Sequence, residues 1–252
     1  MSKPQSAADP IGIEWRGHVA IVTMTATTQR LTNATREALL STLRDLDSET
    51  SRCRAIVLTS AGGTFCAGGH EEESAGPLAL SLFRALAAGR RPVVAAVEGL
   101  AAGPGLSLAA ACDYVIATQR TQFSCSFGTA GLLPEGGIYW SLARRIGAGR
   151  ARQALLSGRL ISGEHALQIG LANELAAPGE ALEKAAGVAA RYAVMPPVAM
   201  AALKAAMATG SDTLDQAIET ETNVQPLLRF TRDHNEAVQA FLQKRAPHFV
   251  GQ

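Results

Sequence analysis

A buried strand, a glycine-rich turn and a helix follow one another repeatedly in the first half of the sequence. One such unit covers 54–89, a second covers 92–112, and the run "DYVIAT" at 113–118 begins the next. Each unit leaves room for a strand and a crossover helix. Strands connected in this way lie parallel, with right-handed crossovers. The sequence therefore predicts an α/β fold.

The rest of the sequence predicts a hairpin at the start and helices at the end. The segment 11–24 alternates around Arg16-Gly17, as two antiparallel strands do, and the leucine spacing in 31–49 predicts a helix. From Leu142 onward the pattern is mostly helical. The helices expected there are 149–157, 163–170, 180–193, 197–209, 212–227 and 233–245.

No linker rich in proline, serine or glycine divides the chain into separate domains. We expect one sheet-containing core over residues 1–196, which carries the functional site, and a helical portion over 197–252. The alanine and leucine face of the last helices could serve subunit contacts or could cover their own core.

Charge and cysteine content exclude several classes of function. The 252 residues include 23 Lys and Arg against 22 Asp and Glu, a formal net charge of +1. This balance attracts neither nucleic acid nor an anionic membrane, so neither is expected as a partner. The four cysteines form no C-x-x-C pair and have no histidine at metal-ligand spacing, which predicts reduced thiols and no metal site. Because the start lacks an apolar segment of signal-peptide length, we expect a cytoplasmic protein.

Two glycine turns, "CAGGH" at 66–70 and "AAGPG" at 101–105, follow neighbouring strands. A turn that opens a helix leaves peptide N–H groups free, and the helix dipole favours a negative oxygen there. If the strands are adjacent and parallel, the turns lie side by side and two amides can hold one oxyanion. Such donors contribute about 3–4 kcal/mol each to a transition state.

Four segments in order along the chain resemble the crotonase, or enoyl-CoA hydratase/isomerase, superfamily. They are "AIVLTSAGGTFCAGG", "RPVVAAVEGLAAGPGLSLAAACDYVIAT", "FGTAGLLPEGG" and "AVQAFLQKRAPHF". The resemblance implies a spiral of ββα turns with a C-terminal helical portion that forms trimers or dimers of trimers. It also implies an acyl-CoA thioester as substrate, with coenzyme A as part of that substrate and no separate cofactor.

The resemblance assigns the oxyanion site to Gly69 and Pro104. In the family two peptide N–H groups hold the thioester enolate; the first falls on Gly69 and the second on Pro104, which has no N–H. Either Gly105 shifts to supply a donor, or Gly69 acts with a water or a side chain, or no enolate is stabilised. Proline also suits the first position of a helix.

The acidic residues near the predicted site do not favour a hydration reaction. The two glutamates of the family's hydratases correspond here to Ser107 and Phe127, neither of which can transfer a proton efficiently at neutral pH. Glu135 in "LLPEGG" resembles the single acid of the 3,2-enoyl-CoA isomerases and of ring-opening isomerases. We expect an isolated, mobile acid that shuttles one proton between two carbons. The alternative is an exposed turn glutamate with no role.

Five further residues are expected to bind the substrate because of the resemblance. Ala67 and Arg30 correspond to contacts with the coenzyme A moiety, and Phe241 and Lys244 to contacts with its nucleotide end from a neighbouring subunit. His70 could donate a proton near the thioester, or could cap the following helix together with the acidic run 71–73. For each charged residue, a solvated helix side chain is the alternative.

Three more side chains near the turns are expected to be structural, and two aromatic ones have two open interpretations. Cys66 has His70 four residues away, but packing is the expected role of this thiol. Glu98 and Asp113 are expected to form structural hydrogen bonds. Tyr139 and Trp140 could wall the acyl pocket or pack in the core.

Taken together, the residues predict an enoyl-CoA isomerase that acts through Glu135. Decarboxylation or C–C cleavage of a β-oxo acyl substrate, with Glu135 or His70, is one alternative. A non-catalytic acyl-CoA-binding homologue is another, favoured by the missing N–H at Pro104.

Overall fold

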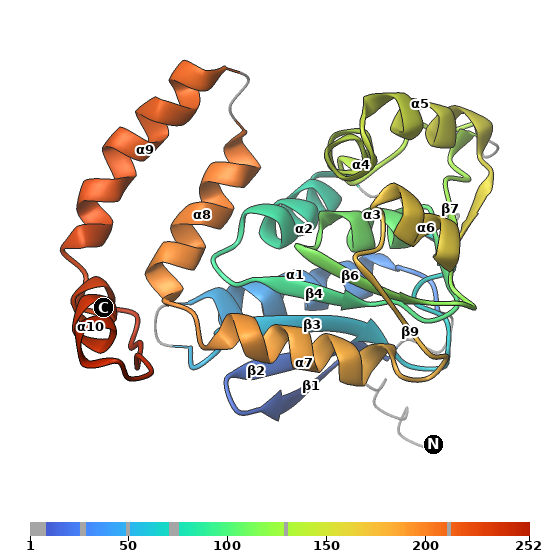
Figure 1. The fold of residues 1–252 in the computed structure, drawn as a ribbon. Coiled ribbons are helices and arrows are strands. Elements are labelled where there is room, and N and C mark those ends of the chain that lie inside the picture. The colour runs from blue at the N-terminus through green and yellow to red at the C-terminus, as the bar shows by residue number, and fades with distance from the viewer. Residues whose placement is uncertain (1–8, 26–28, 49–50, 71–75, 129–130, 211–212) are drawn as a thin grey trace.

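The chain folds as two small sheets covered by helices (Figure 1). This computed structural model describes residues 9–25, 29–48, 51–70, 76–128, 131–210 and 213–252. The strands are β1 (Ile11–Arg16), β2 (Val19–Met24), β3 (Ala55–Ser60), β4 (Val93–Ala96), β5 (Leu100–Ala102), β6 (Tyr114–Thr118), β7 (Gln122–Ser124), β8 (Leu160–Ser162) and β9 (Glu174–Ala176). The helices are α1 (Asn33–Asp47), α2 (Gly76–Ala88), α3 (Pro104–Ala111), α4 (Ile138–Ile146), α5 (Ala148–Ser157), α6 (Gly163–Ile169), α7 (Ala181–Ala193), α8 (Pro197–Thr209), α9 (Leu214–Arg229) and α10 (Arg232–Gln243).

The larger sheet has six strands in the order β1-β2-β3-β4-β6-β9. β1 and β2 form the expected antiparallel hairpin, and from β2 onward every pairing is parallel. The smaller sheet, β5-β7-β8, contains short strands that the sequence did not reveal. The predicted α/β architecture of parallel strands and crossover helices is confirmed.

Each face of the larger sheet has its own hydrophobic layer. On one face, small side chains of α7 such as Ala185 and Ala189 pack against β-branched residues of the strands such as Val57 and Val94. On the other face, α1, α2 and α3 cover the strands with larger side chains. Figure 1 shows α7 across one face and α1 and α2 on the opposite one. This arrangement explains why the strand sequences read as continuous apolar runs: both of their faces are buried.

The two glycine turns lie side by side, as predicted from the parallel strands. β3 and β4 are direct parallel neighbours, with Ile56 opposite Val93. Beyond the strand ends, Cys66 and Ala101 form a further parallel bridge in which Cys66 N–H donates to Leu100 O at 2.9 Å. The start of α3 is therefore held against the first turn.

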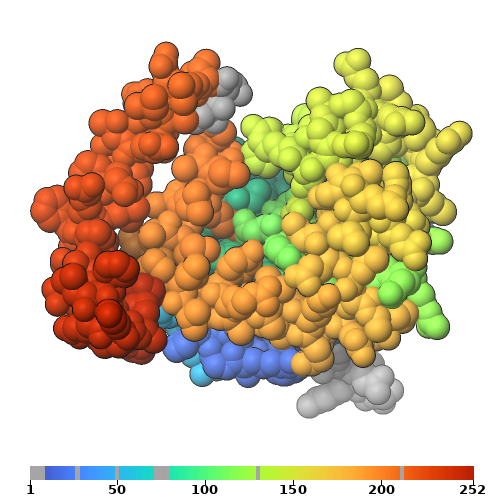
Figure 2. Space-filling model, viewed as in Figure 1, coloured from blue at the N-terminus to red at the C-terminus, as the bar shows by residue number. Residues whose placement is uncertain are grey.

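The last three helices form an arm at one side of the molecule (Figures 1 and 2). α8 is tied to the core by the buried Lys204, whose Nζ donates to Asp113 Oδ2 at 2.6 Å and to Arg91 O at 2.8 Å. α9 has no buried residue. The division at residue 197 and the subunit role of this arm stay predictions.

Among the described residues, no single helix is long and apolar enough to cross a membrane. One pair of consecutive helices, α7 and α8, is long and apolar enough when taken together, but the two helices are bent by 110° relative to each other.

Candidate active site

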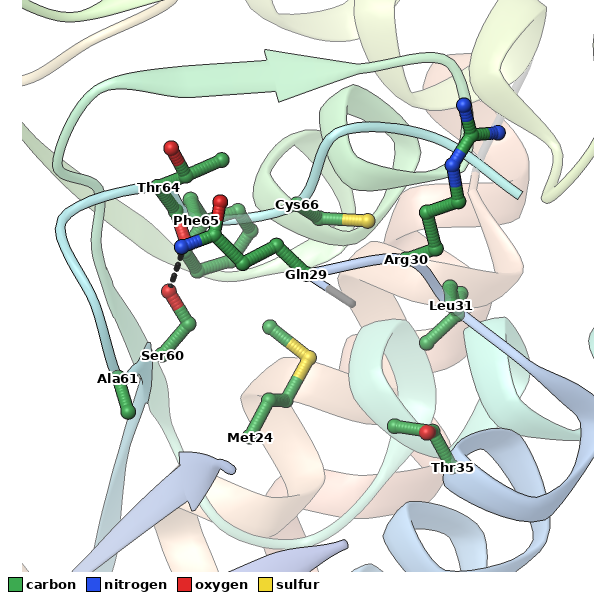
Figure 3. Close-up of a pocket in the computed structure, with 10 residues that line it drawn as sticks. All are labelled: Met24, Gln29, Arg30, Leu31, Thr35, Ser60, Ala61, Thr64, Phe65 and Cys66. Atoms are coloured by element: carbon green, nitrogen blue, oxygen red, sulfur yellow. Dashed lines mark hydrogen bonds between the residues drawn. The ribbon is translucent and has the colours of Figure 1, made fainter. Parts of the chain in front are cut away.

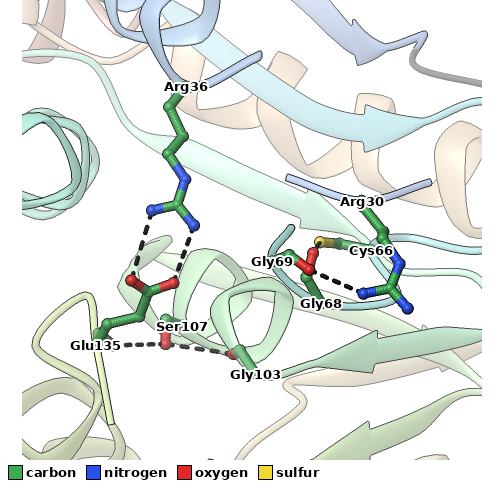
Figure 4. Close-up of polar contacts among 8 residues, drawn as sticks. All are labelled: Arg30, Arg36, Cys66, Gly68, Gly69, Gly103, Ser107 and Glu135. Atoms are coloured by element: carbon green, nitrogen blue, oxygen red, sulfur yellow. Dashed lines mark hydrogen bonds and ion pairs between the residues drawn. The ribbon is translucent and has the colours of Figure 1, made fainter. Parts of the chain in front are cut away.

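The side chains of Arg36, Pro104 and Glu135 lie close to Gly69 at the end of the first turn. The position that a Cβ atom would take on Gly69 lies 3.5 Å from Arg36 Nη2, 3.6 Å from Pro104 Cγ and 4.0 Å from Glu135 Oε1. Figure 4 shows the Arg36 guanidinium pointing at the Glu135 carboxylate, with Gly68 and Gly69 to one side. The structure thus brings the three expected catalytic residues together, although they are far apart in the sequence.

The second turn begins α3 with a proline. Gly103 has φ 50°, which L side chains disfavour, and Pro104 takes the first helical position. The first hydrogen bond of the helix runs from Ser107 N–H to Gly103 O at 3.1 Å. Gly105 is packed so tightly that a Cβ atom there would lie 2.6 Å from Cys66 Cβ. This close packing leaves Gly105 little room to move toward the position of the missing donor.

Glu135 is not the isolated, mobile acid that we expected. Arg36 Nη2 donates to Glu135 Oε1 at 3.0 Å, and Arg36 Nη1 to Oε2 at 3.5 Å. The backbone is held as well, because Ser107 Oγ donates to Glu135 O at 2.9 Å (Figure 4). With 26% of its side chain exposed, Glu135 faces the site while both ends of the residue are restrained. The prediction of a solitary acid was wrong because its partner comes from α1, about a hundred residues earlier.

Sequence reasoning missed Arg36, whose side chain is only 3% exposed. The signal was present: Arg36 precedes the buried Leu39, Leu40 and Leu43 at helical spacing, so it lies on the face of α1 that meets the core. Arginine is rarely buried without a partner. An arginine on an apolar helix face is therefore a pointer to a buried acid or anion.

The family resemblance places the two acids of the hydratases at positions 107 and 127. Here these positions hold a serine and a phenylalanine, both of which are buried. Ser107 is fully buried and donates to Glu135 O. Phe127 is 6% exposed, and its ring lies 3.7 Å from the Cβ position of Gly103. Neither side chain can act as a general acid or base at neutral pH.

Comparison with known proteins assigns the family. The model of the enoyl-CoA hydratase/isomerase family matches residues 14–252. This chain is an enoyl-CoA hydratase/isomerase family member. It is 38% identical over 209 residues to a protein named "probable enoyl-CoA hydratase" from Rhodobacter capsulatus, covering 79% of this chain and 81% of that one. It is 34% identical to the 1,2-epoxyphenylacetyl-CoA isomerase of Escherichia coli, covering 81% and 82%.

Solved structures of the family share the fold over nearly the whole chain. The enoyl-CoA hydratase of Bacillus anthracis superposes with a TM-score of 0.90 at 29% identity, covering 96% of this chain and 100% of that one. The crotonase fold predicted from the four sequence segments is therefore confirmed. An acyl-CoA thioester as substrate is consistent with the family.

Ala67 lies on the first turn of this family member, and Arg30 contacts that turn at Gly69. Arg30 Nη1 donates to Gly69 O at 3.0 Å, and Ala67 N–H donates to Gln29 O at 2.7 Å. The adjoining pocket, lined by Arg30, Cys66 and eight other residues (Figure 3), has a volume of about 10 Å³, room for a single water. It is too small for an acyl chain, and the roles of Arg30 and Ala67 in coenzyme A binding stay predictions.

His70 is exposed at the end of the first turn. The predicted capping role of His70 stays a prediction, because the residues between it and Gly76 lie outside the described part of the chain. The acidic run 71–73 lies outside the described residues. A role of His70 as proton donor stays a prediction.

Phe241 and Lys244 lie on α10 or at its end, in the arm and on the opposite side of the molecule from α4 (Figure 1). Phe241 is 83% exposed. Within one chain these two residues do not join Gly69 and Glu135. Their contact with coenzyme A from a neighbouring subunit stays a prediction.

The structural roles predicted for Glu98 and Asp113 agree with their contacts. Glu98 Oε1 accepts the N–H groups of Gly179 and Ala181 at the start of α7, and Asp113 Oδ2 accepts from Val93 N–H at 2.7 Å. Trp140 lies under the Arg144 guanidinium, 4.0 Å from it, and lines a cavity of about 400 Å³ between α3, α4 and α8. Tyr139 is exposed.

Cys66 is packed, as expected, and unsuited to nucleophilic attack. Burial raises the pKa of the Cys66 thiol, and the thiols of Cys53 and Cys125 have their pKa raised to about 11 by the same cause. At neutral pH a thiol with a raised pKa is protonated and a poor nucleophile. All four cysteines are free and buried.

Proposed function

We propose that this enzyme shifts the double bond of an enoyl-CoA, with Glu135 as the proton shuttle. The observation that carries the proposal is the convergence on Gly69 of one carboxylate, Glu135, while the two other acid positions hold Ser107 and Phe127. Adding water to an enoyl thioester needs a group that activates the water and one that protonates C2. Moving a double bond needs only one group that takes a proton and returns it.

The proposed reaction uses a single acid twice. The Glu135 carboxylate removes a proton from C2 of a 3-enoyl-CoA, and the electron pair of that C–H bond moves into a dienolate whose charge rests on the thioester oxygen. The Gly69 N–H donates to this oxygen. The carboxylic acid of Glu135 then returns the proton to C4, and the product is the conjugated 2-enoyl-CoA.

The restraint on Glu135 supports this role. A shuttle must reach two carbons that lie about 2.5 Å apart along the chain, which requires a short movement of one carboxyl group. Ser107 fixes the backbone of Glu135, so that the side chain alone moves. Positioning of this kind supplies a large part of many enzymatic rate enhancements.

The test is the rate of isomerisation of 3-hexenoyl-CoA, followed by absorbance of the conjugated product. We expect the wild-type enzyme to isomerise it, to add water to 2-hexenoyl-CoA much more slowly, and to lose about 10²–10⁴ in kcat on Glu135→Gln. Glu37→Gln, which removes an exposed carboxylate next to Arg36 in sequence, is the matched control and should leave kcat unchanged.

Two results would contradict the proposal. Hydration faster than isomerisation would show that other groups activate water. Isomerisation unaffected by Glu135→Gln would show that another acid moves the proton. Tight binding of acyl-CoA without turnover would instead support a non-catalytic homologue, and release of CO₂ from a β-oxo acyl substrate would support decarboxylation.

We also propose that the arm formed by α8–α10 joins copies of this chain into a homotrimer or a dimer of trimers. Large apolar side chains on α9 and α10 are exposed, among them Leu214, Leu227, Phe230 and Phe241. Contiguous exposed apolar surface is typical of protein interfaces. The family resemblance supplies the number of subunits.

A further inference from the structure

A buried cationic side chain lies where the enzyme lacks a hydrogen-bond donor. Arg36 Nη2 is 3.5 Å from the Cβ position of Gly69, the residue to which the family resemblance assigns the first oxyanion donor. The ring of Pro104, which has no N–H, lies 3.6 Å from the same position. The guanidinium and the proline therefore border one small region next to Gly69.

The Arg36 guanidinium has hydrogen-bond donors that its contacts with Glu135 do not use. Of its five N–H bonds, the two contacts with Glu135 use one on each Nη atom. The Nε atom is buried and has no acceptor among the described residues. A buried, cationic donor group with unfilled capacity binds an anionic oxygen well, because charge-assisted hydrogen bonds are stronger than neutral ones.

We propose that Arg36 donates the second hydrogen bond to the thioester oxygen as the enolate forms, in place of the peptide N–H that Pro104 lacks. This inference rests on the proposed function only in placing an acyl thioester at Gly69. It makes Arg36 a catalytic residue, since its guanidinium touches the atom on which the charge develops.

The charges in the site support this assignment. Before the reaction the Arg36 cation pairs with the Glu135 carboxylate at 3.0 Å. Once Glu135 has taken the proton from C2 it is neutral, and the negative charge has moved to the thioester oxygen. The cation then stands beside the new charge without any change in the net charge of the site, which is the arrangement that lowers the cost of reorganisation.

The test combines Arg36→Gln with Pro104→Gly, which gives back the peptide N–H. The probe is 4-dimethylaminocinnamoyl-CoA, whose absorbance shifts to longer wavelength when its thioester carbonyl is polarised. We expect the wild-type enzyme to shift the absorbance, Arg36→Gln to lose most of the shift and about 10²–10³ in kcat/KM for 3-hexenoyl-CoA, and the double variant to regain at least about tenfold of that loss. In the wild-type background Pro104→Gly should change the rate much less.

The restored N–H separates this role from a purely positioning one. If Arg36 only orients Glu135, the double variant will be no faster than Arg36→Gln, and the proposal is overturned. It is overturned as well if Arg36→Gln keeps the full absorbance shift. Should Arg36→Gln fail to fold, Arg36→Lys is compared in the same way. We expect Arg36→Lys to give a smaller absorbance shift than the wild-type enzyme, and the addition of Pro104→Gly to increase that shift. Arg44→Gln, at an exposed position of α1, is the control.

The absorbance probe also separates this inference from the isomerisation itself. Glu135→Gln should abolish isomerisation and retain the shift, because the thioester oxygen keeps its donors. A wild-type enzyme that shifts the absorbance but does not isomerise would contradict the proposed function and leave the role of Arg36 standing. A wild-type enzyme that isomerises the substrate would support the proposed function, and if Arg36→Gln then kept the full absorbance shift, the proposed role of Arg36 would be contradicted.

Discussion

At the scale of single residues, the site is built from one acid and the groups that restrain it. Arg36 holds the carboxylate of Glu135 and Ser107 holds its carbonyl oxygen. The family resemblance places Ser107 at a position where hydratases carry an acid, and under the proposed function this serine supports Glu135 instead. The loop behind Glu135 contributes through two glycines with positive φ, Gly136 at 73° and Gly137 at 65°.

These two glycines give a matched pair of variants. A Cβ atom on Gly136 would lie 2.5 Å from Phe83 Cζ, whereas a Cβ atom on Gly137 would meet nothing within 4 Å. Both alanine variants bear a left-handed backbone cost of about 1–2 kcal/mol. We expect Gly136→Ala to lower both the melting temperature and kcat well beyond Gly137→Ala, because the clash displaces the backbone next to Glu135. Equal effects in melting and isomerisation assays would contradict this account of the loop.

At the scale of elements, parallel strands and short turns bring the site together. β3 and β4 are neighbours in the sheet, which sets Gly69 beside the first turn of α3, and α1 then presents Arg36 from the layer that covers those strands. α8 docks on this layer through the buried Lys204. Its Nζ reaches Asp113 at the start of β6 and Arg91 O ahead of β4.

Replacing Lys204 by methionine should cost stability more than catalysis. The side chain is 6% exposed, so Lys204→Met keeps the buried stem but removes the hydrogen bond to Arg91 O and the ion pair with Asp113, which still accepts from Val93 N–H. We expect the free energy of unfolding in urea to fall by about 1–3 kcal/mol, with kcat changed less than twofold. Lys184→Met removes an exposed ion pair with Glu174 and should cost about 0–1 kcal/mol. A loss no greater for Lys204→Met than for this control would show that the link does not hold α8.

At the scale of the whole molecule, the arm of α8–α10 is the part whose apolar side chains are least covered by the rest of the same chain. α9 has no buried residue, and Phe230, which directly follows it, is 86% exposed. The predicted substrate contacts of Phe241 and Lys244 also lie in this arm, away from Glu135. Both observations are accounted for if the arm belongs to an interface between copies of the chain.

Light scattering during size-exclusion chromatography tests this interface. We expect the wild-type enzyme to have a mass of three or six times the 26.2 kDa of one chain. Phe230→Glu places a charge in the apolar surface and should shift the mass toward that of one chain. A wild-type enzyme that stays monomeric at micromolar concentration would contradict the proposed assembly.

The sequence predicted the elements whose signals are local and missed those whose signals are short or distant. β3 and β4 were found because apolar, β-branched runs are followed by glycine turns, β6 was found as a further run of this kind, and α8 was predicted with its observed bounds. β5, β7, β8 and β9 were missed because strands of three residues are too short to show a period.

The site was predicted in outline, without its charge partner. Gly69, Pro104 and Glu135 were each found from a motif within a few residues, and the structure brings them together. Arg36 belongs to no motif, and its pairing with Glu135 joins two segments that only the folded sheet makes neighbours. The prediction of a free, mobile acid failed for that reason.

The central claim is that one acid, Glu135, carries a proton from C2 to C4 of the acyl chain. The most direct test is the conversion of 3-hexenoyl-CoA labelled with deuterium at C2, in ordinary water, with the product analysed by mass spectrometry and NMR. We predict 2-hexenoyl-CoA that carries deuterium at C4 in a substantial share of turnovers, and no such product from Glu135→Gln. Product without deuterium at C4, formed equally fast by both enzymes, would contradict the claim.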